Sequence, residues 1–198
     1  MRLRWTADRL RSGEGVGAIG LGADRAPPDL VSEQALRDHY ALYLGYVDAF
    51  NRAAAGAPPE THGCPRTASF LVGAVALHEA YFLGVAASHP PPGDGPLVHA
   101  IWARFGGIDP WWDEMSAAAR CARGWAILGA DRDRSLHVVT LDTHDVGSEP
   151  DWEPVCVVDA YEHAYWRDFG PDRPGYLDVL SLCLDWPEME RRYAGAWR

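Results

Sequence analysis

The chain has 198 residues, of which 47% are hydrophobic and 23% charged, and its formal net charge is −10. This length and balance are typical of one globular domain, or of two small ones that share a core. The acidic balance argues against a protein that binds nucleic acid without sequence preference, because such binding needs a basic face. The longest apolar runs are far shorter than a membrane span.

The cysteines and the N-terminal residues indicate a compartment. The first residues have no apolar core of the kind that a secretory signal needs. The cysteines form no C-x-x-C pair and show no zinc-ribbon spacing. We therefore expect reduced thiols in a cytoplasmic protein. These cysteines are Cys64, Cys121, Cys156 and Cys183.

The first half of the chain is expected to be helical. Residues 1–30 contain clustered glycines and are predicted to be an irregular N-terminal extension. Helical spacing then begins at Ser32, a suitable N-cap, and we expect a loop from Asn51 to Arg66. A second helix, apolar on nearly all sides, is predicted from Ala68 to Ala87. The pair predicts a helical-hairpin domain over residues 31–92.

The second half, residues 93–198, mixes the two kinds of element. A run rich in proline and glycine marks its start. Asp109 and Pro110 are expected to be the N-cap and first residue of a helix. Strands are predicted at 124–128, 136–141 and 154–158, and helices at 97–105, 110–122, 171–183 and 186–194. The fold class is therefore α+β: a long-helix hairpin followed by a small three-stranded antiparallel sheet packed with helices.

The segment from Asp159 to Tyr165 is the most informative for function. The apolar run Val155–Val158 reads as a buried strand, and Asp159 follows it directly. A strand that ends in Asp and turns into a helix can aim Asp159 and His163 at one point. Because a buried carboxylate is costly unless it is paired or bound to a metal, this corner suggests a metal site.

Two other histidines extend this candidate site. His39 and His78 each lie on the apolar face of a predicted helix, where a single histidine is more often a hydrogen-bonded core residue than a ligand. Together with Asp159 and His163 they supply three imidazoles and one carboxylate. That set suits Fe, Mn or Zn and leaves an open coordination position.

The motifs around these residues resemble the iron/manganese superoxide dismutases. The run Val158–Tyr165 resembles their D-x-W-E-H-A-Y signature, and it is followed by counterparts of R-x-x-Y and N-W. Upstream, Leu77-His78-x-x-Tyr81-Phe82 resembles N-H-x-x-F-W. The segment from His39 to Asn51 resembles the family's first-helix ligand, gateway tyrosine and following Asn. The match runs in order from about Ser32 to Tyr193.

The resemblance implies a role for each matching residue. His39, His78, Asp159 and His163 would bind the metal, and Tyr46 would be the gateway tyrosine that relays protons. His144 would stand where the family places a Gln or His beside the metal-bound solvent. Residues expected around the metal or at a dimer interface are Tyr43, Trp125, Tyr161, Glu162, Tyr165 and Arg173. Of these, Arg173 is expected to steer the anionic substrate, and Glu162 to reach a ligand histidine of a second subunit.

Some positions depart from the family pattern. Tyr161 replaces a usual Trp, Leu77 replaces a usual Asn, and Tyr43 lies in the stretch where a His is common. Seven residues separate His39 from Tyr46 instead of eight, so an ungapped count would make Asp38 the ligand. We prefer His39, because positions i and i+7 share a helical face and because the site then has one acid.

The resemblance implies dismutation of superoxide to oxygen and hydrogen peroxide by one Fe or Mn ion per subunit. The sequence does not choose between the two metals. Superoxide would be the small-molecule substrate of a homodimer or a dimer-based tetramer, with no nucleic acid or membrane partner. Two alternatives stay open: a metal-dependent, oxygenase-like oxidoreductase that uses the same ligands on an organic substrate, and a non-catalytic metal-binding module.

Overall fold

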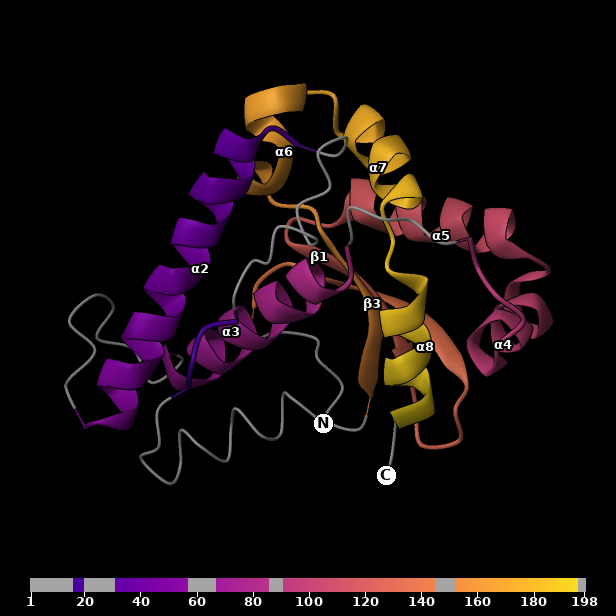
Figure 1. Cartoon of the computed structure of the whole chain (residues 1–198), viewed down its shortest axis with the longest axis horizontal. Coiled ribbons are helices and arrows are strands. Elements are labelled where there is room, and N and C mark those ends of the chain that lie inside the picture. The colour runs from indigo at the N-terminus through magenta and orange to yellow at the C-terminus, as the bar shows by residue number, and fades with distance from the viewer. Residues whose placement is uncertain (1–15, 20–30, 57–66, 86–90, 145–151, 196–198) are drawn as a thin grey trace.

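The computed structural model describes residues 16–19, 31–56, 67–85, 91–144 and 152–195. These residues contain seven helices and one three-stranded antiparallel sheet. The helical hairpin comes first in the chain, and the sheet with its covering helices follows (Figure 1). The predicted α+β class is therefore confirmed.

The hairpin consists of α2 (Glu33–Ala54) and α3 (Thr67–Leu83). The hydroxyl of Ser32 accepts a hydrogen bond from the backbone N–H of Ala35 at 3.2 Å, as expected of an N-cap. Helix α2 continues four residues past Phe50 into the predicted loop, because its last turn is rich in alanine, the best helix former. Residues 86–87, predicted to end the second helix, lie outside the described residues.

Part of the predicted N-terminal extension lies on α2. Residues 16–19 have no regular secondary structure. The backbone N–H of Val16 donates to Asn51 Oδ1 at 2.7 Å, and Asn51 Nδ2 donates to the Val16 carbonyl at 3.0 Å. The N–H of Ile19 donates to the hydroxyl of Tyr43 at 3.0 Å. This short segment is thus tied to the helix that carries His39.

A helix pair opens the second half, with α4 (Pro96–Phe105) followed by α5 (Ile108–Cys121). Gly106 ends α4 in the left-handed region, at φ 87°, where a side chain would be strained. The N-cap of α5 is Gly107, so the prediction of Asp109 as the cap is wrong. Asp109 instead lies in the first turn, where its charge favours the helix dipole.

The sheet has the strand order β2-β1-β3. Its strands are β1 (Trp125–Ala130), β2 (Leu136–Leu141) and β3 (Glu153–Asp159). Strand β1 is central and buried along its whole length. At one end of the sheet, Trp125 pairs with both Leu141 and Asp159. This register brings the ends of β2 and β3 to the same edge as the start of β1.

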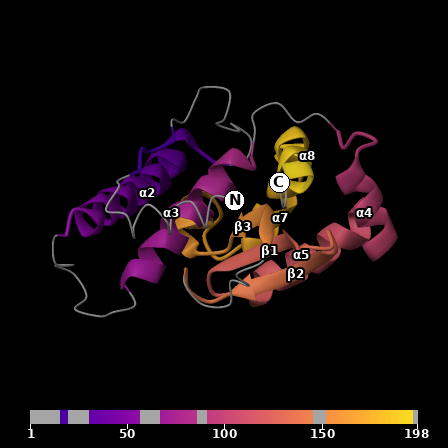
Figure 2. The ribbon, with the colours of Figure 1, turned by 90° about the horizontal axis from the view of Figure 1, so that it is seen from below.

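Helices cover the sheet and join it to the hairpin. Helices α3 and α8 (Trp186–Gly195) pack against β3, and α5 packs against β1 and β2. Helix α6 (Glu162–Phe169) lies against α2, and α7 (Arg173–Leu182) follows it (Figure 1). Viewed from below, α2 and α3 lie side by side next to the sheet (Figure 2). No helix in the described part of the chain is long and apolar enough to cross a membrane.

Candidate metal centre

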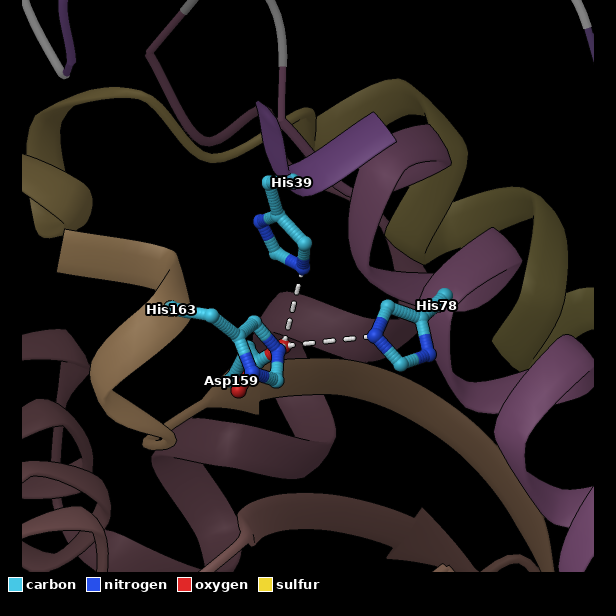
Figure 3. Close-up of side chains that lie close together, drawn as sticks. All are labelled: His39, His78, Asp159 and His163. Carbon is cyan, nitrogen blue, oxygen red and sulfur yellow. Dashed lines mark hydrogen bonds and ion pairs between the residues drawn. The ribbon is translucent and has the colours of Figure 1, made fainter. Parts of the chain in front are cut away.

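Four side chains from four different elements converge where the hairpin meets the sheet (Figure 3). His39 comes from α2, His78 from α3, Asp159 from the end of β3 and His163 from the first turn of α6. One donor atom from each of the four lies within 4.8 Å of the others. The structure therefore brings together the four ligands expected from the sequence.

The buried face of α2 presents His39 to this group. His39 is 3% exposed and shares that face with Tyr43, Val47 and Phe50. Asp38, the alternative from an ungapped count, lies away from the cluster and accepts a hydrogen bond from Gln34 at 2.8 Å. Its other oxygen pairs with the exposed Arg167. The geometry thus places His39, rather than Asp38, among the donors.

The corner between β3 and α6 fixes the carboxylate of Asp159. The backbone N–H of Tyr161 donates to Asp159 Oδ1 at 2.9 Å, and the hydroxyl of Tyr176 donates to the Asp159 carbonyl at 3.2 Å. This local turn uses one carboxylate oxygen and directs the other, Oδ2, toward the histidines. Because α6 begins at Glu162, His163 lies one turn beyond the acid on the same side.

The distances around Oδ2 are those of a ligand set. His39 Nε2 and His163 Nε2 each lie 3.1 Å from Asp159 Oδ2, and His78 Nε2 lies 3.9 Å from it. Among the described residues, neither His39 Nε2 nor His78 Nε2 has a hydrogen-bond partner of good geometry, although both are buried. Buried polar nitrogens left without partners are costly, and a metal ion is the ligand that would satisfy them. The residues present therefore fit a mononuclear metal.

The ionisation of the cluster supports this fit. Burial lowers the pKa of His39 and lowers the pKa of His78 to about 3, so both rings are neutral at physiological pH. Burial alone would raise the pKa of Asp159, but His163 and His39 outweigh it and hold that pKa well below its usual range. Metal binding requires neutral imidazoles and an ionised carboxylate, which are the forms present here.

A hydrogen bond sets the tautomer of His78. Its Nδ1 lies 2.7 Å from the backbone carbonyl of Ala74, one turn earlier in α3. A carbonyl only accepts, so Nδ1 carries the proton and Nε2 turns its lone pair toward the cluster. Ala74 itself is small and fully buried.

His144 lies beside the cluster, 3% exposed, just after β2. The indole N–H of Trp125 donates to His144 Nδ1 at 3.0 Å, and His144 Nε2 lies 3.4 Å from the hydroxyl of Tyr46. The ring of Tyr46 is centred 5.3 Å from that of His78. The structure thus groups Trp125, His144 and Tyr46 along one side of the metal cluster.

Two of the positions that depart from the family pattern lie directly against the ligands. The ring of Tyr161 stacks on that of His163 at 5.2 Å, and its hydroxyl donates to the Asp142 carbonyl at 3.2 Å. The ring of Tyr43 stacks against His78 at 6.4 Å. Leu77 is buried, 2% exposed, next to His78 in sequence.

Sequence reasoning missed a buried acid beside the site. Glu79 is 1% exposed, and its Oε1 accepts a hydrogen bond from the hydroxyl of Tyr43 at 2.9 Å. Burial and the negative charge of Glu79 raise the pKa of Tyr43 well above its usual range. The signal was present in the sequence: Glu79 is the one acid in the apolar α3 segment Thr67–Leu83.

Arg173 occupies a different setting from the expected one. Its Nε donates to the hydroxyl of Tyr165 at 3.0 Å, and its Nη1 donates to the carbonyls of Ala119 and Ala122 at the end of α5. These bonds cap a helix C-terminus, where a cation is favoured by the dipole. The geometry of Arg173 therefore gives the steering prediction no support.

Glu162 is exposed, and His163 is the least buried of the four donors, with 29% of its side chain exposed. Both lie in the first turn of α6, beside the half-exposed Trp166. The His163 side of the cluster therefore lies near the protein surface.

An α+β fold that converges three histidines and one aspartate on one point defines a mononuclear metalloprotein. Comparison with known proteins narrows this class. The family model of the iron/manganese superoxide dismutases, C-terminal domain, matches residues 93–192. The chain therefore belongs to the iron/manganese superoxide dismutase family.

Relatives extend the match into the hairpin. Superoxide dismutase 1 of Halobacterium salinarum, named as a manganese enzyme, is 31% identical over 176 residues, which span 84% of this chain and 88% of the relative. The superoxide dismutase of Aquifex aeolicus, named as an iron enzyme, is 37% identical over 125 residues, 63% of this chain and 59% of the relative. A second iron-named relative, from Methanothermobacter marburgensis, is 29% identical over 177 residues, 82% of this chain and 88% of its own length.

Proposed function

We propose that this chain disproportionates superoxide to oxygen and hydrogen peroxide at one iron or manganese ion held by His39, His78, Asp159 and His163. The observation that carries the proposal is the pair of buried nitrogens, His39 Nε2 and His78 Nε2, which face a carboxylate oxygen without hydrogen bonds of their own among the described residues. The membership of the family and the names of the relatives support the reaction.

An iron or manganese ion held by these four residues would supply the one-electron couple that the dismutation of superoxide needs. The protein has two tasks beside this chemistry. It keeps the compensating negative charge of Asp159 in a buried position beside the neutral rings of His39 and His78. It also delivers two protons to the reduced substrate, since hydrogen peroxide is the product.

Tyr46 and His144 are proposed to handle these protons. An indole N–H only donates, so Nδ1 of His144 accepts from Trp125, and the neutral ring carries its proton on Nε2. That nitrogen faces the hydroxyl of Tyr46. Burial and the charge of Asp159 raise the pKa of Tyr46, so the phenol keeps its proton at neutral pH. Two proton donors, the Tyr46 hydroxyl and the His144 Nε2–H group, therefore lie next to each other beside the cluster.

A dimer is proposed from the surface around His163. A metal-binding histidine ordinarily donates its second N–H to an acceptor. No residue in the described ranges accepts from His163 Nδ1, and 29% of that side chain is exposed. Glu162 is exposed next to it and carries an acceptor suited to a symmetric exchange between two subunits. The half-exposed Trp166 adds apolar area to the same patch.

Other parts of the proposal concern organisation and compartment. A boundary between residues 92 and 93 is supported by the family match, which begins at residue 93. Cys121, Cys156 and Cys183 carry free thiols, which supports a reducing, cytoplasmic setting. The steering of the anionic substrate is better assigned to Arg123 than to Arg173, because the side chain of Arg123 is exposed to solvent. Burial and Asp159 raise the pKa of the nearby Tyr161 to about 12, against the opposing charge of Arg123.

Metal analysis combined with a superoxide assay tests this function. Protein loaded with iron or manganese should bind about one ion per chain and accelerate superoxide decay. His163→Ala should lose both properties. His99→Ala should keep both, because His99 is exposed and pairs only with Asp94 in the described structure.

Metal retention without superoxide decay would contradict the dismutase proposal and favour an oxidoreductase acting on an organic substrate. Failure of the wild-type chain to retain either ion would favour a non-catalytic module.

A further inference from the structure

The segment 142–144, which carries His144, touches α3 at Gly73. A methyl group at Gly73 would lie 1.9 Å from the carbonyl oxygen of His144 and 2.8 Å from its carbonyl carbon. Both atoms belong to the backbone, so a side chain at this position would force the segment or the helix to move. Gly73 therefore permits a contact between α3 and His144 that no other residue allows.

The same segment is held from the opposite side by Tyr161. The Tyr161 hydroxyl donates to the carbonyl of Asp142, two residues before His144. Gly124 makes room for this phenol, since a methyl group there would lie 2.9 Å from Tyr161 Cζ and 2.8 Å from the Leu141 carbonyl. The segment thus lies between α3 and the β3–α6 corner, which both carry metal-binding residues.

The position of the segment decides what the His144 ring can reach. Its Nδ1 accepts from Trp125, and its Nε2 faces Tyr46 at 3.4 Å, already at the long end of a hydrogen bond. The ring of Phe70 closes a further side, edge-on at 4.6 Å. A shift of a few tenths of an ångström would break one of these contacts.

We propose that Gly73 and the Tyr161 hydroxyl are positioning residues, which clamp residues 142–144 and so aim the His144 imidazole between Trp125 and Tyr46. Neither residue supplies a reacting group. The catalytic value of the clamp rests on the proposed dismutase function, but the placement itself is a property of the fold.

Two substitutions and two matched controls test the clamp. Gly73→Ala adds the clashing methyl group, and Gly45→Ala adds a methyl group to α2 where nothing lies within 4 Å. Tyr161→Phe removes a hydroxyl that bonds a backbone carbonyl. Tyr193→Phe, on α8, removes another such hydroxyl, which donates to the Arg134 carbonyl at 3.0 Å.

The primary readout is the hydrogen-exchange rate of the Trp125 indole N–H, measured by NMR in the full chain loaded with diamagnetic zinc. The NMR signal of this proton is assigned by its absence in Trp125→Phe. This proton reports the bond to His144 and needs no turnover. Gly73→Ala and Tyr161→Phe should speed its exchange about fivefold, the effect of weakening one buried hydrogen bond. Gly45→Ala and Tyr193→Phe should leave it unchanged.

In the iron- or manganese-loaded protein, the two clamp variants should keep their metal but lower turnover and shift its pH profile. Unchanged indole exchange in both would overturn the proposal, as would equal acceleration in the controls. Tyr161→Trp serves as a second variant without the phenol hydroxyl. If Gly73→Ala and both Tyr161 variants fail to fold, these residues serve stability instead, and the proposal is wrong. If the clamp variants speed the indole exchange as expected but the metal-loaded wild-type protein does not turn over superoxide, only the proposed function is contradicted.

Discussion

The protein pairs histidine with aspartate in two different settings. At the surface, His99 lies 2.6 Å from Asp94 and His137 lies 2.8 Å from Asp131, each a single ring against a single acid. In the interior, three histidines share the one carboxylate of Asp159, at longer distances. The surface pairs satisfy themselves, whereas the interior group turns a carboxylate oxygen and imidazole lone pairs such as that of His78 toward one point, and none of these can donate a hydrogen bond to another. This excess of buried lone pairs, and not the His–Asp pairing itself, distinguishes a metal site.

Removing the acid from each setting gives the largest expected difference. Asp159→Asn should lower metal affinity and superoxide turnover by more than about a hundredfold, because it replaces the charged ligand of the cluster. Asp131→Asn keeps an oxygen for the N–H groups of Asp133 and Ser135, so activity should stay within about twofold. Metal content and initial rates of superoxide decay measure both. Equal losses in the two variants would remove the distinction.

The two settings should also respond differently to acid. Burial lowers the pKa of His39 and His78 below the ordinary 6.5. Between pH 6.5 and about 3, the pKa of His78 in the folded protein, the unfolded chain therefore binds a proton at His78 that the folded chain does not. The free energy of unfolding of the metal-free protein should fall as the pH drops through this window, by on the order of 5 kcal/mol.

Urea unfolding at several pH values measures this slope. His78→Leu should flatten it, and His99→Ala should not change it, since His99 is exposed. A metal-free protein whose stability is constant over this pH range would show that the buried imidazoles already carry protons.

Tyr46→Phe gives a smaller effect, which separates the ligands from their proton supply. The variant keeps the ring beside His78 and loses the hydroxyl that faces His144. Metal content should be unchanged, and turnover should fall roughly tenfold or more in the step that consumes protons. Stopped-flow superoxide decay as a function of pH measures this. Loss of metal in Tyr46→Phe would instead make the hydroxyl part of the support for the ligand cluster.

Local sequence patterns were sufficient to predict most of the helices and strands and the four side chains of the metal cluster. Ser32 caps α2 as its side chain predicts, and the apolar run before Asp159 is a strand. The i, i+7 argument for His39 agrees with the buried face of α2. These features depend on neighbours in the sequence or on a specific motif, so the sequence alone exposes them.

What the sequence concealed depends on packing between distant elements. The contact of Gly73 with His144 joins residues 71 positions apart and leaves no trace in composition or periodicity. The bonds of Arg173 to the end of α5 likewise follow from how α7 lies against α5. The burial of Glu79 could be suspected from its apolar surroundings, but its bond to Tyr43 required the angle between α2 and α3.

The four donors span positions 39 to 163, and they come from both the hairpin and the sheet. An ion bound by all four is therefore a cross-link whose largest loop between successive ligands, from His78 to Asp159, spans about 80 residues, and such closures restrict an unfolded chain strongly. Metal release should then loosen the seam between α3 and β3 before the rest of the protein. The ion that serves the chemistry would therefore also cross-link the helical hairpin to the sheet.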